Sequence, residues 1–131
     1  MKNALKKTYT DWQKLWFWGI FVLAVVTRLW NLSGLPSGLN QDEAFAGFEA
    51  YNLLRTGMDS WLNPWPVYFV AWGSGMNVLY SYLTMPFIAL FGLEVWVVRL
   101  PQAIFGILSC YLFYRLVSLM FDKRAGLGGF F

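Results

Sequence analysis

The chain has 131 residues, of which 58% are hydrophobic, 21% aromatic and only 13% charged, whereas soluble domains carry about 25% charged residues. A soluble domain of this size leaves about a third of its chain surface exposed to water. It could not bury this much aromatic surface, so the composition predicts a membrane protein. The absence of histidine and the single cysteine, Cys110, exclude His-based catalysis, His-containing zinc sites and an internal disulfide.

The first apolar run, residues 15–32, reads LWFWGIFVLAVVTRLWNL. At about 1.5 Å per residue it just crosses the hydrocarbon core of a bilayer. Its only charge, Arg28, lies near one end, and Trp16 and Trp30 fit the two interfacial aromatic belts. A cleaved signal peptide is the alternative, but no A-x-A-like site follows Val26. We therefore predict an uncleaved transmembrane helix.

Charge placement orients this helix. Residues 1–14 contain four lysines, whereas Asp42, Glu43, Glu49 and Asp59 follow the apolar run. Because basic residues favour the cytoplasmic side, we predict a cytoplasmic tail over residues 1–14. Residues 33–98 then form an external loop.

Within this loop, a Gly/Pro/Ser turn leads into a predicted amphipathic helix over residues 43–56, with Asn40 or Asp42 as its cap and Gly57 as its end. On a helical wheel, one side carries Ala44, Gly47, Phe48, Ala50, Tyr51 and Leu54. The other side carries Glu49, Asn52 and Thr56. The segment that follows is rich in tryptophan and proline, including Trp61, Pro64, Trp65, Pro66 and Trp72. We expect it to form an irregular loop on the membrane surface.

Two further apolar runs follow. Residues 78–93 contain Pro86 and are short for a span, which predicts an interfacial or re-entrant helix. Residues 99–121 are long enough to cross, with Pro101 in the first turn, where proline is tolerated. If both runs cross, the chain has three spans; the positive-inside rule favours two.

The predicted fold class is therefore an all-α polytopic membrane protein, with two transmembrane helices and an external loop of amphipathic juxtamembrane helices. Three transmembrane helices are the alternative. Residues 122–131 form a cytoplasmic turn that becomes apolar again, as if another span were starting. We expect the chain to be the amino-terminal part of a larger protein and to lack activity alone.

Candidate chemistry centres on the acids of the external loop. Asp42 and Glu43 lie just after the first apolar run, where carboxylates also cap helices. Adjacent helical positions diverge by about 100°, so one carboxylate acting alone is more plausible than a dyad. Glu49 shares the predicted face of Asp42, and its alternative role is a solvated helix surface. Too few oxygen ligands gather here to predict a metal site.

Three segments in order carry a resemblance: LPSGLNQDEAFAGFEAYNLLRTGMDSW, PWPVYFVAWGSGMNVLYSYLTMPFIALFGL and VRLPQAIFGIL. Their arrangement after a first membrane helix resembles the amino-terminal part of the GT-C type of membrane glycosyltransferase. It is most similar to glycosyltransferase family 39, which is related to protein O-mannosyltransferases and to lipid A aminoarabinose transferases.

This resemblance implies an inverting transferase at the external face of the plasma membrane, spanning the membrane several times. The sugar would move from a polyprenyl-phosphate carrier to a protein, lipid or glycan acceptor. The resemblance assigns the general base to Asp42, with Glu43 beside it. No nucleic acid and no cofactor are implied, while a need for a divalent cation stays open. The candidate residues for binding the donor are Glu49, Arg55, Trp72 and Arg99, with headgroup anchoring as the alternative for both arginines. A different class, a small membrane adaptor or assembly subunit without catalysis, is the rival hypothesis.

Overall fold

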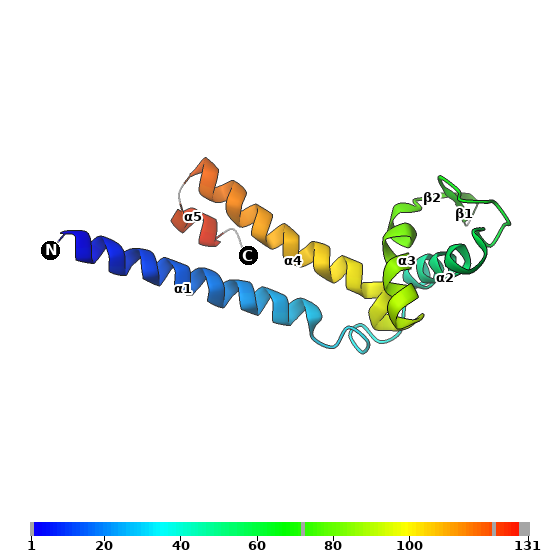
Figure 1. Ribbon diagram of the computed structural model, residues 1–131, viewed down its shortest axis with the longest axis horizontal. Coiled ribbons are helices and arrows are strands. Elements are labelled where there is room, and N and C mark those ends of the chain that lie inside the picture. Colours follow the sequence, from blue (N-terminus) through cyan, green and yellow to red (C-terminus); the bar gives the residue numbers. More distant parts are fainter. Residues whose placement is uncertain (1, 72, 122, 129–131) are drawn as a thin grey trace. The chain divides into compact units, whose positions relative to one another are not determined.

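The computed structural model describes residues 2–71, 73–121 and 123–128 (Figure 1). Two compact units make up the chain. Residues 1–30 and 103–131 form the first, here called the helix-pair unit, and residues 31–102 form the second, here called the loop unit. The loop unit therefore corresponds closely to the segment that the charge pattern predicts to be external.

The helix-pair unit contains α1 (Lys2–Leu29), most of α4 (Val95–Met120) and α5 (Lys123–Gly128). Within the described ranges, α4 is the one helix that is long and apolar enough to cross a membrane. Its 26 residues extend about 39 Å at about 1.5 Å per residue. α1 includes most of the predicted tail and ends at Leu29, so residues 30–32 of the predicted first span lie in a turn.

Side-chain contacts between α1 and α4 define how the two helices run. The ring centroids of Phe17 and Tyr114 lie 4.6 Å apart. Towards the other end of the pair, a Cβ added to Gly106 would lie 3.0 Å from Arg28 Nε. Residue numbers rise along one helix as they fall along the other, so α1 and α4 are antiparallel (Figure 1).

The outer faces of these two helices are apolar. The exposed large side chains include Val22, Leu23, Val26, Leu108, Leu112 and Leu116. Small side chains, by contrast, are buried, namely Ala24, Ala103 and Cys110. Large residues outside and small residues inside are typical of helices packed in lipid, where close backbone approach replaces the hydrophobic effect between helices.

The loop unit begins with α2 (Gln41–Thr56). Asn40 is its N-cap: the Asn40 side chain accepts a hydrogen bond from Glu43 N at 2.8 Å, and the Glu43 side chain accepts one from Asn40 N at 3.2 Å. This capping box decides between the two predicted caps in favour of Asn40. At the other end, Gly57 adopts φ 73°, a left-handed conformation that glycine adopts without steric cost. The predicted end of the helix is therefore confirmed.

α2 packs against α3 (Leu79–Phe91) through small and polar residues. Ser81 Oγ donates a hydrogen bond to the carbonyl of Ala46 at 2.9 Å, and both residues are buried. On the same helix, Gly47 faces Val98 at the start of α4, and a Cβ there would lie 2.7 Å from Val98 Cγ2. Close approach at these positions holds α2 against α3 and against the first turn of α4. α3 occupies most of the predicted interfacial segment 78–93, and its 13 residues are fewer than the roughly 20 needed to span a bilayer.

The buried face of α2 agrees only in part with the predicted wheel. The buried residues of the helix are Ala46, Gly47, Glu49, Ala50 and Leu53, of which Gly47 and Ala50 lie on the predicted apolar side. Phe48 and Leu54 of that side are 51% and 37% exposed, and Glu49, whose alternative role was a solvated helix surface, is 0% exposed. The physical reason is tertiary: small residues bring α2 close to α3, and a following loop supplies hydrogen bonds to Glu49.

The segment after α2 also departs from the expectation of an all-α fold. β1 (Phe69–Ala71) and β2 (Ser74–Met76) form an antiparallel pair, with Phe69 opposite Met76 and Ala71 opposite Ser74. Gly73 adopts φ 77°, which suits a tight connection between strands. The prolines that argued against regular structure lie before β1, where they do not interrupt the strand ladder.

α4 begins at Val95, four residues before the predicted start at 99. Pro101 therefore lies inside the helix and not in its first turn. Proline cannot donate to the carbonyl four residues before it. Pro101 and Val97 are both fully buried, so surrounding side chains hold this part of the helix in place.

Candidate active site

Asp42 is the second residue of α2 and its carboxylate is exposed. An acidic side chain in the first turn of a helix interacts favourably with the helix dipole. Among the residues that the structure describes, none donates a hydrogen bond to the Asp42 side chain or forms an ion pair with it. Asp42 is therefore not the cap of the helix, and its oxygens are available to accept a proton.

Arg99 of α4 contacts the first turn of α2 through Glu43 and is 5% exposed. Its Nε and Nη2 donate hydrogen bonds to the Glu43 carboxylate, the shortest at 3.0 Å. Its Nη1 donates to the carbonyls of Leu32 and Pro36, both at 2.9 Å, and its Nη2 also donates to the carbonyl of Gly38. A guanidinium has five N–H donors, and all of them are engaged in this way.

This arrangement, here called the Arg99 clamp, ties residues 32–38 to the first turn of α2. Because every N–H of Arg99 already has an acceptor within the chain, the geometry points to a positioning role and not to the phosphate contact expected from sequence. The clamp fixes the backbone of the turn from which the Asp42 side chain projects.

Glu43 has two partners in the clamp, since it also completes the capping box with Asn40. The hydrogen bonds from Arg99 hold the pKa of the Glu43 carboxyl below its ordinary value of 4.5, with partial burial acting in the opposite direction. A carboxylate that is ionised and fully paired is a poor proton acceptor. Of the two adjacent acids, Asp42 is therefore the one suited to act as a base.

Glu49 and Asp59 anchor the loop that follows α2. The buried Glu49 carboxylate accepts hydrogen bonds from Ser60 N at 2.9 Å and from Ser60 Oγ. Asp59 is 3% exposed and accepts hydrogen bonds from Trp61 N, Asn63 N and Asn63 Nδ2 at 2.8–3.0 Å. Glu49 thus does not share an accessible face with Asp42, and its contacts are those of a structural residue.

The remaining sequence candidates lie apart from the Arg99 clamp. Arg55 is exposed near the end of α2, with its guanidinium 5.5 Å from the ring centroid of Tyr51. Trp72 lies outside the described residues. Nearby, Trp65 stacks on Tyr82 with centroids 6.2 Å apart, and Trp61 Nε1 donates a hydrogen bond to the carbonyl of Val70.

Metal-binding capacity is limited in this part of the chain. Over the described ranges, no three His, Cys, Asp or Glu side chains come close enough to hold a metal ion. Glu43, Glu49 and Asp59 already accept hydrogen bonds from the chain. Asp42, by contrast, has a carboxylate with no partner among the described residues and can accept a proton.

The partners of Arg99, Glu43 and Glu49 could not be predicted from the sequence. Arg99 and Glu43 are 56 positions apart, and Glu49 and Ser60 are 11 apart, so no periodicity connects them. A signal was nevertheless present for Arg99: an arginine that opens a long apolar run must be paired or reach the interface.

Comparison with known proteins concerns the carboxy-terminal part of the chain. Residues 77–131 match the family model described as dolichyl-phosphate-mannose-protein mannosyltransferase. This segment contains α3, α4 and Arg99, whereas Asp42 precedes it. No curated protein and no solved structure gives a significant match. The match supports a membrane glycosyltransferase of the GT-C type and leaves the particular GT-C family open.

Proposed function

We propose that this chain is the amino-terminal part of a GT-C glycosyltransferase of the family 39 kind. It moves a sugar from a polyprenyl-phosphate carrier to a protein, lipid or glycan acceptor at the external face of the plasma membrane. Asp42 acts as the general base that deprotonates the acceptor hydroxyl, and the sugar is transferred with inversion. The match of residues 77–131 supports the class of enzyme.

The observation that carries the assignment of the base is the contrast between two adjacent acids. Glu43 is held by Arg99 and Asn40, whereas Asp42 is exposed and, among the described residues, unpaired. A base must be within reach of the acceptor and must have a free lone pair. The exposed carboxylate of Asp42 has such a lone pair among the described residues, which supports the proposal, and the Arg99 clamp fixes the helix turn that carries it.

The antiparallel pair of α1 and α4 supports a two-span membrane arrangement. If α4 crosses the bilayer, an antiparallel α1 that crosses with it returns the chain to the same side, so the loop unit lies on one face. α3 packs on α2 within that unit and needs no crossing of its own. The lysines of residues 1–14 favour the cytoplasm, which puts the loop unit outside.

This topology can be tested by cysteine labelling in a Cys110→Ala background. Leu62 is 76% exposed in the loop unit, so Leu62→Cys should react with an impermeant maleimide in intact cells. Asp122→Cys, at a position outside the described residues, should react only after the cells are permeabilised. Efficient labelling of Asp122→Cys in intact cells would mean three spans and would contradict the two-span arrangement.

The donor must keep its polyprenyl chain in hydrocarbon while its phosphosugar reaches Asp42. We propose that the segment from Trp61 to Leu93, with Trp72 within it, lies at the outer headgroup level and contributes to the donor groove. Tryptophan has an apolar ring and a polar N–H, which suits this depth. Arg55 is the exposed cation of this unit that could contact the leaving phosphate.

The proposed function can be tested by supplying labelled sugars in two forms. Membranes containing the protein from its complete reading frame are incubated with hexoses and pentoses, linked either to polyprenyl phosphate or to a nucleotide. Incorporation into acceptor should occur from at least one lipid-linked sugar and exceed that of membranes without the protein. Incorporation from nucleotide sugars alone would contradict the donor class. No incorporation from any donor would favour the adaptor hypothesis.

A further inference from the structure

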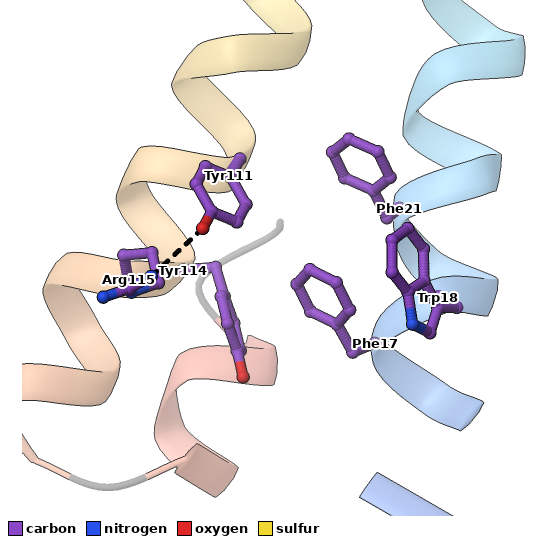
Figure 2. Close-up of a pocket in the computed structure, with 6 residues that line it drawn as sticks. All are labelled: Phe17, Trp18, Phe21, Tyr111, Tyr114 and Arg115. Carbon is purple, nitrogen blue, oxygen red and sulfur yellow. Dashed lines mark hydrogen bonds between the residues drawn. The ribbon is translucent and has the colours of Figure 1, made fainter. Parts of the chain in front are cut away.

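A groove lies between α1 and α4 in the helix-pair unit (Figure 2). Its volume is about 500 Å³, within the range of about 300–1,000 Å³ that small-molecule sites occupy. The lining residues are Phe17, Trp18, Phe21, Tyr111, Tyr114 and Arg115. Five aromatic rings and one cation therefore line this space.

The walls of the groove are held by ring contacts. Phe17 stacks with Phe21 at a centroid distance of 5.9 Å, and it meets Tyr114 of the other helix at 4.6 Å. Figure 2 shows the Phe17, Phe21 and Tyr114 rings facing the space between the helices. Trp18 remains 59% exposed at its edge. An apolar chain can lie against such aromatic walls.

The cation sits at the rim. Arg115 is exposed, donates one hydrogen bond from Nη1 to Tyr111 Oη at 3.1 Å, and lies 6.0 Å from the Tyr111 ring centroid. Among the described residues, no carboxylate pairs with it, so most of its N–H donors are available. Unlike the buried Arg99, this guanidinium can bind an anion from outside the chain.

The groove lies towards the amino-terminal part of α1. Phe17 is 12 positions before the end of α1 at Leu29, which is about 18 Å at about 1.5 Å per residue. This part of the helix is close in sequence to the lysines of residues 1–14, and Lys14 lies one turn before Trp18. In the proposed topology, this depth corresponds to the cytoplasmic leaflet, away from the external donor.

We propose that this groove binds an anionic phospholipid of the cytoplasmic leaflet, with an acyl chain against the aromatic walls and the phosphate on Arg115. Charge complementarity selects this occupant: apolar walls open to lipid admit any acyl chain, but a free cation at the rim favours a lipid with net negative charge. The proposal goes beyond the transferase function. It rests on the helix-pair unit lying in a membrane, and the assignment to the cytoplasmic leaflet rests on the proposed topology.

The fluorescence of Trp18, at the edge of the groove, can report which lipid lies there. The protein from its complete reading frame is reconstituted in phosphatidylcholine vesicles that contain a brominated lipid, either phosphatidylglycerol or phosphatidylcholine. The contribution of Trp18 is the difference in quenching between wild type and Trp18→Phe. One cation near an anionic lipid contributes about 1 kcal/mol, so brominated phosphatidylglycerol should associate about fivefold more strongly than brominated phosphatidylcholine.

Arg115→Gln should remove most of this preference, and Arg115→Lys should retain much of it. Arg28→Gln is the matched control, because Arg28 is a cation of the same helix pair but lies beside Gly106, towards the other end of the pair from the groove. The lipid preference of this variant should stay at the wild-type level. Equal quenching of Trp18 by the two lipids, no quenching by either because protein fills the groove, or an equal loss in Arg28→Gln would each overturn the proposal.

Discussion

Asp42→Asn is expected to lower the transfer rate by about 10²–10⁴-fold, the usual effect of removing a general base, while the protein still inserts and accumulates normally. The amide keeps the size of the side chain but cannot take up the proton of the acceptor hydroxyl. Because Asn40 and not Asp42 caps α2, the helix should lose little stability. The measurement is transfer from a lipid-linked donor in membranes with equal amounts of each variant.

Glu94→Gln is a suitable control, because Glu94 is also an exposed acid of the loop unit but lies before α4 and away from the Arg99 clamp. Its transfer rate should stay close to that of wild type. If Asp42→Asn were also within a few fold of wild type, Asp42 would contribute only to the helix dipole. Loss of accumulated protein in Asp42→Asn would instead indicate a structural role.

Arg99→Met is expected to destabilise the loop unit by about 3–5 kcal/mol, as is typical when one partner of a buried ion pair is removed. Methionine roughly preserves the apolar stem. However, it leaves the carbonyls of Leu32, Pro36 and Gly38 without their donor and Glu43 without its cation. The free energy of unfolding can be measured by denaturant titration in detergent, with tryptophan fluorescence as the signal.

A double-mutant cycle with Glu43→Gln separates the ion pair from the carbonyl contacts. The double variant should be less destabilised than the sum of the two single variants.

The pH dependence of stability provides a second test. Because the pKa of Glu43 is lowered in the folded state, the ionised Glu43 stabilises the fold above its ordinary pKa of 4.5. This stabilisation disappears as the pH falls through the lowered pKa. Glu43→Gln should lack this dependence. A loss below about 0.5 kcal/mol for Arg99→Met, the size of a neutral surface change, would show that the clamp does not stabilise the loop unit.

The sequence alone was sufficient to predict two of the helices, α2 and α4. Gly57 predicts the end of α2, and Asn40 or Asp42 predicts its start to within two positions, because capping depends on neighbouring backbone groups. The apolar run from residue 99 predicts α4, apart from its first turn. Composition alone predicts that lipid must cover these helices, since no soluble core of this size buries so much aromatic surface.

The tertiary structure alone decided which face of α2 is buried and what each charged residue contacts. A helical wheel sorts residues by polarity alone, so it assigns Glu49 to the solvent-facing side. The Ser60 groups that donate hydrogen bonds to the buried Glu49 carboxylate lie in a loop, where no periodic pattern indicates them. The sequence predicts that Arg99 contacts the donor or the lipid headgroups. In the structure, its acceptors come from the turn before α2 and from Glu43. Hydrogen bonds between distant segments depend on how the chain folds back on itself, and for that reason the sequence singled out Asp42 and Glu43 together but could not tell that Arg99 binds Glu43.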